Sequence, residues 1–333
     1  MRKFKGEGPL LLPVRSGEEE RVANVVMERL RHGAEVVASP FEPRSKLIYQ
    51  LLAVELLATA ILFPATGFSI SIRAAAAFPL WAFFLCFAAL LLRRYGHSRT
   101  SDAMEATGLV YGQGFLLLFL LFPLTAMSAP FADDALAGID RFLGFDWPSF
   151  ASLFVGRRFA QWALVVVYHS FIWQPLVIVL SLFASGRDDR AWQFVTAGTL
   201  AALITGLLFP FAPALGAFVH YGVEPGAFPK LQSGWQFAPV LHAIKDEGVR
   251  LITPQMFSGV VSFPSYHAAA ALIFAWAMWP FRARWLFVVL NIGVCASALI
   301  VGAHYFIDIL AGLAVGGAAI FVSCPRSDQQ LCS

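Results

Sequence analysis

Long apolar runs alternate with short polar segments along most of this chain. About eight runs are long and apolar enough to form membrane-spanning helices, because a bilayer core about 30 Å thick takes roughly 20 helical residues. We place them at residues 47–64, 75–92, 109–127, 162–184, 194–218, 265–279, 285–301 and 309–324. The pattern therefore predicts an all-α polytopic membrane protein.

The composition supports this fold class. Of 333 residues, 58% are hydrophobic and 14% are charged, whereas a soluble domain carries about 25% charged residues. The net charge of +3 gives no indication of nucleic-acid binding. The four cysteines lack the close spacing of metal-binding pairs, so we interpret them as small apolar residues outside disulfides. They are Cys86, Cys295, Cys324 and Cys332.

Basic residues follow every second apolar run. They include Arg93, Arg94 and Arg99, then Arg187 and Arg190, then Arg282 and Arg284. Cytosolic loops carry an excess of arginine and lysine, so both chain ends should lie in the cytosol. The longer connecting segments, residues 129–160 and 219–263, should then lie outside. We expect the cell membrane, the inner membrane of a bacterium, with any site on these segments facing the periplasm.

We divide the chain into four parts. Residues 1–46 are a cytosolic polar head with an amphipathic helical pattern, and residues 47–107 form two extra transmembrane helices. Residues 108–326 form a six-helix core, and residues 327–333 are a cytosolic tail.

Two histidine motifs carry the candidate chemistry. The first, Pro-Ser-Tyr-His, ends at His267, and the second, His-Tyr-Phe-Ile-Asp, runs from His304 to Asp308. Two predicted membrane crossings separate the motifs, so both histidines return to the same face of the membrane. Asp308 lies four residues beyond His304 and shares its helical face. This convergence indicates catalysis rather than packing.

These residue types suit the transfer of a phosphoryl group. A neutral imidazole can attack phosphorus when a carboxylate holds its other nitrogen, a role that fits His304 with Asp308. His267 then fits the general acid on the leaving oxygen. Ser265 and the first N–H groups of the helix that follows can bind phosphoryl oxygens. Asp308 could instead cap the helix that it opens.

The two motifs resemble those of the type 2 phosphatidic acid phosphatase superfamily. Pro264 to His267 is similar to its P-S-G-H motif, and His304-x-x-x-Asp308 to the end of its third motif. With Phe263 before the proline, the pattern most resembles the inositol phosphorylceramide synthase branch, an inositolphosphotransferase. The resemblance covers about residues 108–326. It implies a phosphohistidine intermediate, with no metal and no other cofactor.

The chain lacks the basic residues that the family has in its first and third motifs. The first motif, K-x6-R-P, is absent, and Ala298 stands at the arginine of the third motif. A phosphate site needs cations, so we place Lys245 and Arg250 in the substrate-binding set, with Lys230 and Arg141 behind them. Tyr266 and Tyr305, which adjoin the two histidines, complete that set with Ser265.

The predicted function is transfer of a phosphoryl-containing head group from a lipid phosphate ester to an alcohol, a polyol or a lipid alcohol. Hydrolysis of phosphatidic acid or polyprenyl (pyro)phosphate by water is the alternative. His267, His304 and Asp308 could instead bind zinc, although the chain has no close ligand pair. A transporter is the non-enzyme alternative, but the predicted spans contain almost no charges.

Overall fold

The computed structural model describes residues 43–76, 80–229, 233–257 and 262–324. Most of the predicted polar head, Lys230 and the predicted tail lie outside the described residues. The described part is helical apart from one parallel pair of two-residue strands, β1 (Ser69–Ile70) and β2 (Leu251–Ile252). The predicted all-α membrane fold is therefore confirmed.

Most of the described helices correspond to the predicted spans. These are α2 (Lys46–Ala65), α4 (Leu80–Arg94), α5 (Ser98–Ala126), α8 (Arg158–Ala184), α9 (Asp188–Leu208), α12 (Tyr266–Ala277), α13 (Arg284–Val301) and α14 (Phe306–Ser323). The other described helices have 13 residues or fewer: α3 (Ile72–Ala76), α6 (Asp133–Phe142), α7 (Trp147–Ser152), α10 (Ala217–His220) and α11 (Ser233–Lys245). Four 3-10 turns complete the described elements: η1 (Pro43–Ser45), η2 (Phe209–Phe211), η3 (Pro225–Ala227) and η4 (Pro254–Met256).

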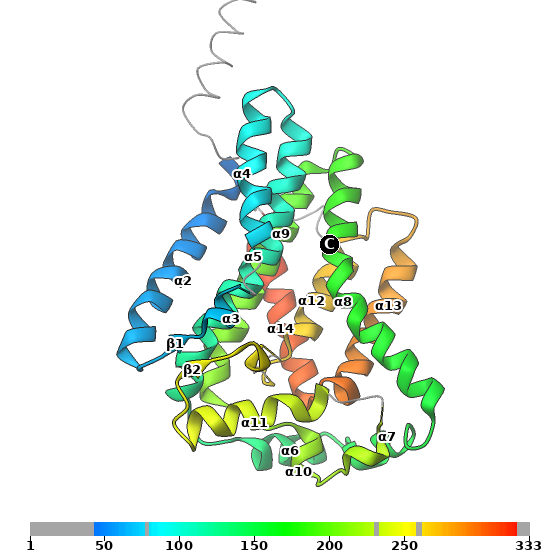
Figure 1. The fold of residues 1–333 in the computed structure, drawn as a ribbon. Helices are drawn as coiled ribbons and strands as arrows, with labels where there is room; N and C mark the ends of the chain where they lie inside the picture. The colour runs from blue at the N-terminus through cyan, green and yellow to red at the C-terminus, as the bar shows by residue number, and fades with distance from the viewer. Residues whose placement is uncertain (1–42, 77–79, 230–232, 258–261, 325–333) are drawn as a thin grey trace, which may run out of the picture. The chain divides into compact units, whose positions relative to one another are not determined.

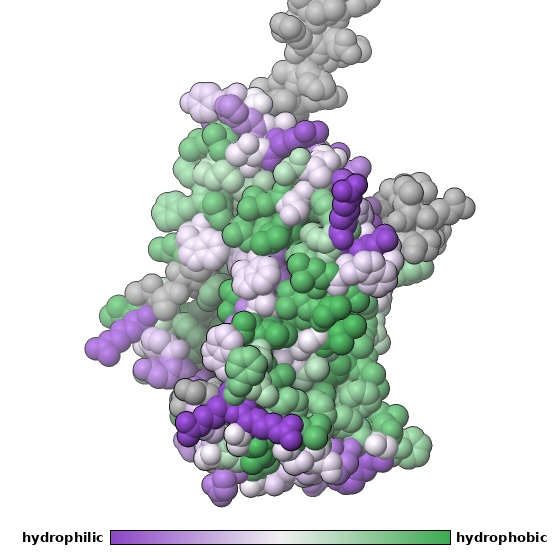
Figure 2. Space-filling view, turned by 90° about the vertical axis from the view of Figure 1, so that its right-hand side faces the viewer, coloured by the Kyte–Doolittle hydropathy of each residue, from purple (hydrophilic) through white to green (hydrophobic). Residues whose placement is uncertain are grey.

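Among the described residues, 7 helical segments are long and apolar enough to cross a membrane. The eighth predicted span, residues 265–279, is α12, which has 12 residues and a length of about 18 Å. Ser265 caps its start directly after Pro264, and Pro280 follows its end, so prolines bound the helix on both sides. Figure 2 shows a broad apolar surface with hydrophilic residues gathered mainly towards the two ends.

Helix α12 lies among α9, α13 and α14 and packs against all three. The short helices α6, α7, α10 and α11 lie together across one end of the bundle, and the turns between α4 and α5 and between α8 and α9 lie at the other (Figure 1). These short helices come from the two long segments that were predicted to lie outside the membrane.

Buried charges hold the N-terminal helices against α5. The Arg93 guanidinium contacts the carboxylates of Asp102 at 2.5 Å and Glu105 at 2.6 Å. Within α2, Glu55 is 2% exposed and accepts a hydrogen bond from Gln113 Nε2 at 3.0 Å. The spans thus carry more charged residues than we expected; Arg93 pairs with two carboxylates, and Glu55 accepts a hydrogen bond from a neutral amide.

One cysteine differs from the prediction. Cys86 and Cys295 are free, whereas Cys324, just after α14, is disulfide-bonded. The interpretation of all four cysteines as unpaired was therefore wrong for Cys324, because spacing along the chain does not reveal which cysteine pairs meet the distance that a disulfide requires.

Candidate active site

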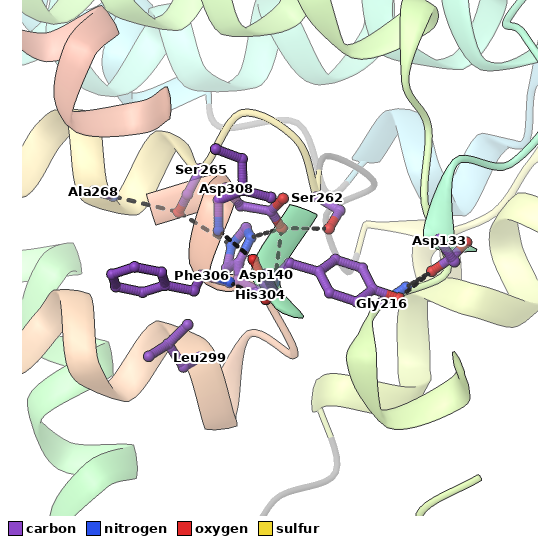
Figure 3. Close-up of polar contacts among 12 residues, drawn as sticks. Asp133, Asp140, Gly216, Ser262, Ser265, Ala268, Leu299, His304, Phe306 and Asp308 are labelled. Atoms are coloured by element: carbon purple, nitrogen blue, oxygen red, sulfur yellow. Dashed lines mark hydrogen bonds and ion pairs between the residues drawn. The ribbon is translucent and has the colours of Figure 1, made fainter. Parts of the chain in front are cut away.

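The two histidine motifs meet where α12 and α14 begin (Figure 3). Ser265 is the N-cap of α12, and its Oγ accepts a hydrogen bond from the Ala268 N–H at 3.4 Å. The Ser265 N–H donates to the backbone carbonyl of Asp308 at 3.0 Å. The backbone therefore fixes the start of one helix against the start of the other.

His304 and Asp308 form a buried pair. The distance from His304 Nδ1 to Asp308 Oδ2 is 3.1 Å, and the two residues are 3% and 0% exposed. The same oxygen accepts hydrogen bonds from Ser262 Oγ and from the Tyr305 N–H, each at 3.0 Å. Asp308 thus caps α14 and contacts His304 at the same time, so the geometry of the cap and that of the histidine partner coexist.

The other ring nitrogen of His304 faces Ser265. The distance from Nε2 to Ser265 Oγ is 3.2 Å. If Asp308 is ionised, it requires the proton on Nδ1, and Nε2 then carries a lone pair and accepts the hydroxyl proton of Ser265. This is the tautomer that a nucleophilic histidine needs.

His267 lies beside this pair without a hydrogen bond to it. Its ring stacks on Tyr168, with centroids 4.4 Å apart, and contacts Phe171 at 4.6 Å. The His267 and His304 ring centroids are 6.2 Å apart. Tyr266 turns towards the bundle, where its ring meets Phe171 edge-on at 5.8 Å.

The turn between α13 and α14 presents His304. A Cβ on Gly302 would come within 2.8 Å of His304 Cδ2 and 2.9 Å of the Ala298 carbonyl, so this position requires glycine. Ala303 has a φ of 52°, and its carbonyl accepts the Ala217 N–H at 2.8 Å. The indole N–H of buried Trp147 donates to the His304 carbonyl at 3.1 Å.

Two carboxylates of α6 support the same turn. Asp140 accepts hydrogen bonds from the first two N–H groups of α14, at Phe306 and Ile307, each at 2.8 Å. Asp133 accepts the Tyr305 hydroxyl at 2.8 Å. Burial raises the pKa of Asp140. Burial and then the nearby Asp133 charge raise the pKa of Tyr305.

Sequence reasoning missed these supports. Asp133 and Asp140 are seven residues apart on an amphipathic stretch, and this spacing places both on one helical face. This spacing could have identified the two carboxylates from the sequence. No such pattern identifies Ser262, Tyr168 or Trp147, because the residues that they contact are distant in the chain.

Lys245 and Arg250, which were predicted to bind phosphate, instead donate hydrogen bonds to backbone carbonyls. Lys245 Nζ donates to the carbonyls of Ser128 at 3.0 Å and Ala129 at 2.7 Å, and to Ser128 Oγ at 2.8 Å. Burial lowers its pKa. Arg250 donates to the carbonyls of Thr66 at 3.1 Å and Ile244 at 2.7 Å. Both side chains bind the ends of helices, and neither contacts His304 or Ser265.

Three other histidines have local partners. His169 Nδ1 is 2.8 Å from the Val165 carbonyl. His220 is paired with Asp134 at 3.5 Å, and His242 with Asp246 at 2.5 Å. Within the described part of the chain, no group of three or more His, Cys, Asp or Glu side chains is arranged to hold a metal ion. The zinc hypothesis therefore gains no support from these residues.

Comparison with known proteins places the chain in a family. The family model of the PAP2 superfamily, the type 2 phosphatidic acid phosphatases, matches residues 134–322, which is more than half of the chain and includes both histidine motifs. No curated protein and no solved structure matches the chain. The superfamily inferred from the two motifs is confirmed. The chain belongs to the PAP2 superfamily, whose members are generally phosphatases or phosphotransferases of lipid phosphates.

Proposed function

We propose that the protein is an integral membrane phosphotransferase that cleaves a lipid phosphate ester through a covalent phosphohistidine at His304. One observation carries this proposal: Asp308, His304 and Ser265 form a continuous hydrogen-bonded chain, with distances of 3.1 Å and 3.2 Å. This series of hydrogen bonds ends at Ser265, the N-cap of α12, and the start of a helix favours a bound anion.

The first step is nucleophilic attack. His304 Nε2 attacks the phosphorus, the bond from phosphorus to the lipid oxygen breaks, and His267 gives its proton to that oxygen. Asp308 stabilises the positive charge that develops on the His304 ring. The two histidine ring centroids are 6.2 Å apart, so both rings can contact one phosphate ester.

The phosphoryl oxygens need hydrogen-bond donors. The first N–H groups of a helix lack partners within that helix, and in α12 these belong to Tyr266 and His267. We assign phosphoryl binding to these groups and to the Ser265 hydroxyl, which leaves His304 Nε2 when the substrate enters. Lys245 and Arg250 then act by positioning the segments around the site, and Tyr305 by holding the turn before α14.

The second step regenerates the enzyme. The acceptor hydroxyl loses its proton to His267, its oxygen attacks phosphorus, and the bond to His304 breaks. The resemblance of the motifs to the inositol phosphorylceramide synthase branch favours an alcohol acceptor. Water in the same position would make the protein a lipid phosphate phosphatase.

A cavity next to His267 supports a lipid substrate. It has a volume of about 510 Å³, lies between α5, α8, α9 and α12, and is lined by Tyr266 and His267 at one end. Pockets of this size suit small ligands and single lipid chains. Two of its glycines, Gly114 and Gly198, have nothing within 4 Å of an added Cβ. We assign this space to a hydrocarbon chain of the substrate.

The six helices α5, α8, α9, α12, α13 and α14 form the catalytic core in this proposal, with the site on the periplasmic face. Ser149 is exposed at the α7 end of the molecule, and Ala283 is exposed in the turn between α12 and α13. With the native cysteines replaced by alanine, Ser149→Cys should react with an impermeant thiol reagent on intact cells. Ala283→Cys should react only after permeabilisation, and the reverse pattern would place the site in the cytosol.

The acceptor is tested with purified protein and phospholipids labelled at phosphorus. We expect a labelled water-soluble phosphoester when inositol or another polyol is the acceptor, and a new labelled lipid when a lipid alcohol is the acceptor. Neither product should form with His304→Ala. Release of free phosphate, unchanged by the polyol, would identify a phosphatase. Equal product from the wild type and from His304→Ala would contradict both forms of the proposal.

A further inference from the structure

A second cavity is lined by neither histidine of the proposed catalytic site. It has a volume of about 570 Å³, and its walls come mainly from α12 and α13, including Ala271, Ala275, Val288 and Ile292. It extends along α12 to Trp279, just beyond the end of that helix. Near this end lies Arg284, the first residue of the 18-residue helix α13, about 27 Å along that helix from the turn that holds His304.

Arginine and tryptophan side chains surround the mouth of this cavity. The Arg190 guanidinium carbon is 4.2 Å from the ring centroid of Trp276, and both residues line the cavity. The Arg284 guanidinium carbon is 5.5 Å from the ring centroid of Trp279, which also lines it. Trp285 completes the cluster, at 5.8 Å from Trp279.

Among the described residues, no ion pair joins a carboxylate to Arg190 or Arg284 at this mouth. The two acidic residues nearest in sequence are paired elsewhere, Asp188 with Arg99 at 3.8 Å and Asp189 with Arg44 at 3.2 Å.

Arg190 is held in place by the end of α12. Its Nη2 donates to the Trp276 carbonyl at 2.5 Å, and its Nε to the Ala277 carbonyl at 3.3 Å. These contacts fix the guanidinium beside the mouth and leave N–H donors for a further acceptor. The indole N–H of Trp276 is also buried, without a hydrogen-bond partner among the described residues.

We propose that this cavity and its mouth bind one anionic phospholipid. One hydrocarbon chain lies between α12 and α13, and the phosphate contacts Arg190 and Arg284. Basic pockets between transmembrane helices bind anionic head groups, and tryptophan concentrates at the depth of those head groups. The net positive mouth selects an anionic lipid over a zwitterionic one. The site does not depend on the proposed reaction.

The test measures lipid binding to the purified full-length protein by native mass spectrometry. Phosphatidylglycerol is titrated against phosphatidylcholine. We expect Arg284→Gln to weaken phosphatidylglycerol binding about fivefold, the effect of one basic side chain near an anionic lipid surface. Ala275→Phe should fill the cavity and abolish the same binding. Arg282→Gln is the matched control, because Arg282 is exposed just before α13 and, unlike Arg284, has no described contact with Trp279 or another residue that lines the cavity.

Two results would overturn the proposal. The first is equal retention of phosphatidylglycerol by the wild type, Arg284→Gln and Ala275→Phe. The second is equal binding of phosphatidylcholine and phosphatidylglycerol by the wild type. Arg190→Gln serves only as a supporting variant, because Arg190 also caps α12. A phospholipid bound at the catalytic site would not respond to Arg284→Gln, so this test is independent of the proposed function.

Discussion

Replacing Asp308 by asparagine tests the role of the carboxylate most sharply. The substitution keeps the size of the side chain and an oxygen that can accept hydrogen bonds from Ser262 and the Tyr305 N–H, both now at 3.0 Å. It removes the negative charge that faces His304 Nδ1 at 3.1 Å. All three contacts use Oδ2. An amide oxygen in that place would keep them and remove only the charge that stabilises the His304 cation, whereas an NH₂ in that place would lose both accepted bonds and favour the tautomer with its proton on Nε2, which cannot attack phosphorus.

The expected loss of turnover is large compared with the loss of stability. In a catalytic triad, the same substitution lowers turnover about 10⁴-fold, which corresponds to about 5.5 kcal/mol in the activation free energy. Hydrogen bonds to a charged group contribute about 1.5–3 kcal/mol each. Because the asparagine oxygen keeps part of them, we expect the free energy of unfolding to fall by no more than about 3 kcal/mol.

The assay measures turnover of a labelled lipid phosphate together with the thermal midpoint of the purified protein. Asp140→Asn is the matched control, since Asp140 also bonds the first turn of α14, through Phe306 and Ile307, but does not touch His304. It should lower the thermal midpoint and leave turnover close to that of the wild type. Turnover by Asp308→Asn within tenfold of the wild type would refute the catalytic role and leave Asp308 as a helix cap.

Three further predictions concern the acid, the cavity and the metal. His267→Ala should lower turnover about 10²–10⁴-fold and should lower it least for a nitrophenolate leaving group; equal losses for good and poor leaving groups would exclude the acid role. Gly198→Leu should lower kcat/KM for long-chain more than for short-chain lipid phosphates, whereas Gly317→Leu, in α14 outside the cavity, should leave that ratio unchanged. An unchanged ratio in Gly198→Leu would show that the hydrocarbon chain of the substrate does not bind in this cavity. Activity should survive EDTA, and a loss restored by Zn²⁺ would favour the metal hypothesis.

The sequence predicted the helices well because long apolar runs have few alternatives in a membrane protein. It overestimated α12. Apolar residues continue through Met278 and Trp279 into the turn, so hydropathy alone could not show that the helix ends at Ala277. Pro264 and Pro280 mark the outer limits of the span, but they do not show that the helix stops three residues before Pro280.

In the candidate site, contacts between residues close in sequence were predictable, and contacts between distant residues were not. The contact of His304 with Asp308 was predicted from their spacing, but the helical geometry behind that prediction was wrong: α14 begins at Phe306, so His304 lies in the turn before the helix. The contact of Tyr305 with Asp133 joins residues 172 positions apart and depends on how α6 packs. Lys245 and Arg250 show a further limit: a long basic side chain satisfies a phosphate and a helix-end carbonyl equally well.

The central claim is that His304 carries the transferred group, and trapping the phosphoenzyme tests it most directly. The protein is mixed with a lipid phosphate labelled at phosphorus, quenched within one turnover, and digested for mass spectrometry. We predict an acid-labile, base-stable label on the peptide that contains His304, reduced in Asp308→Asn and absent in His304→Ala. Turnover without label on this peptide, or activity retained by His304→Ala, would contradict the account.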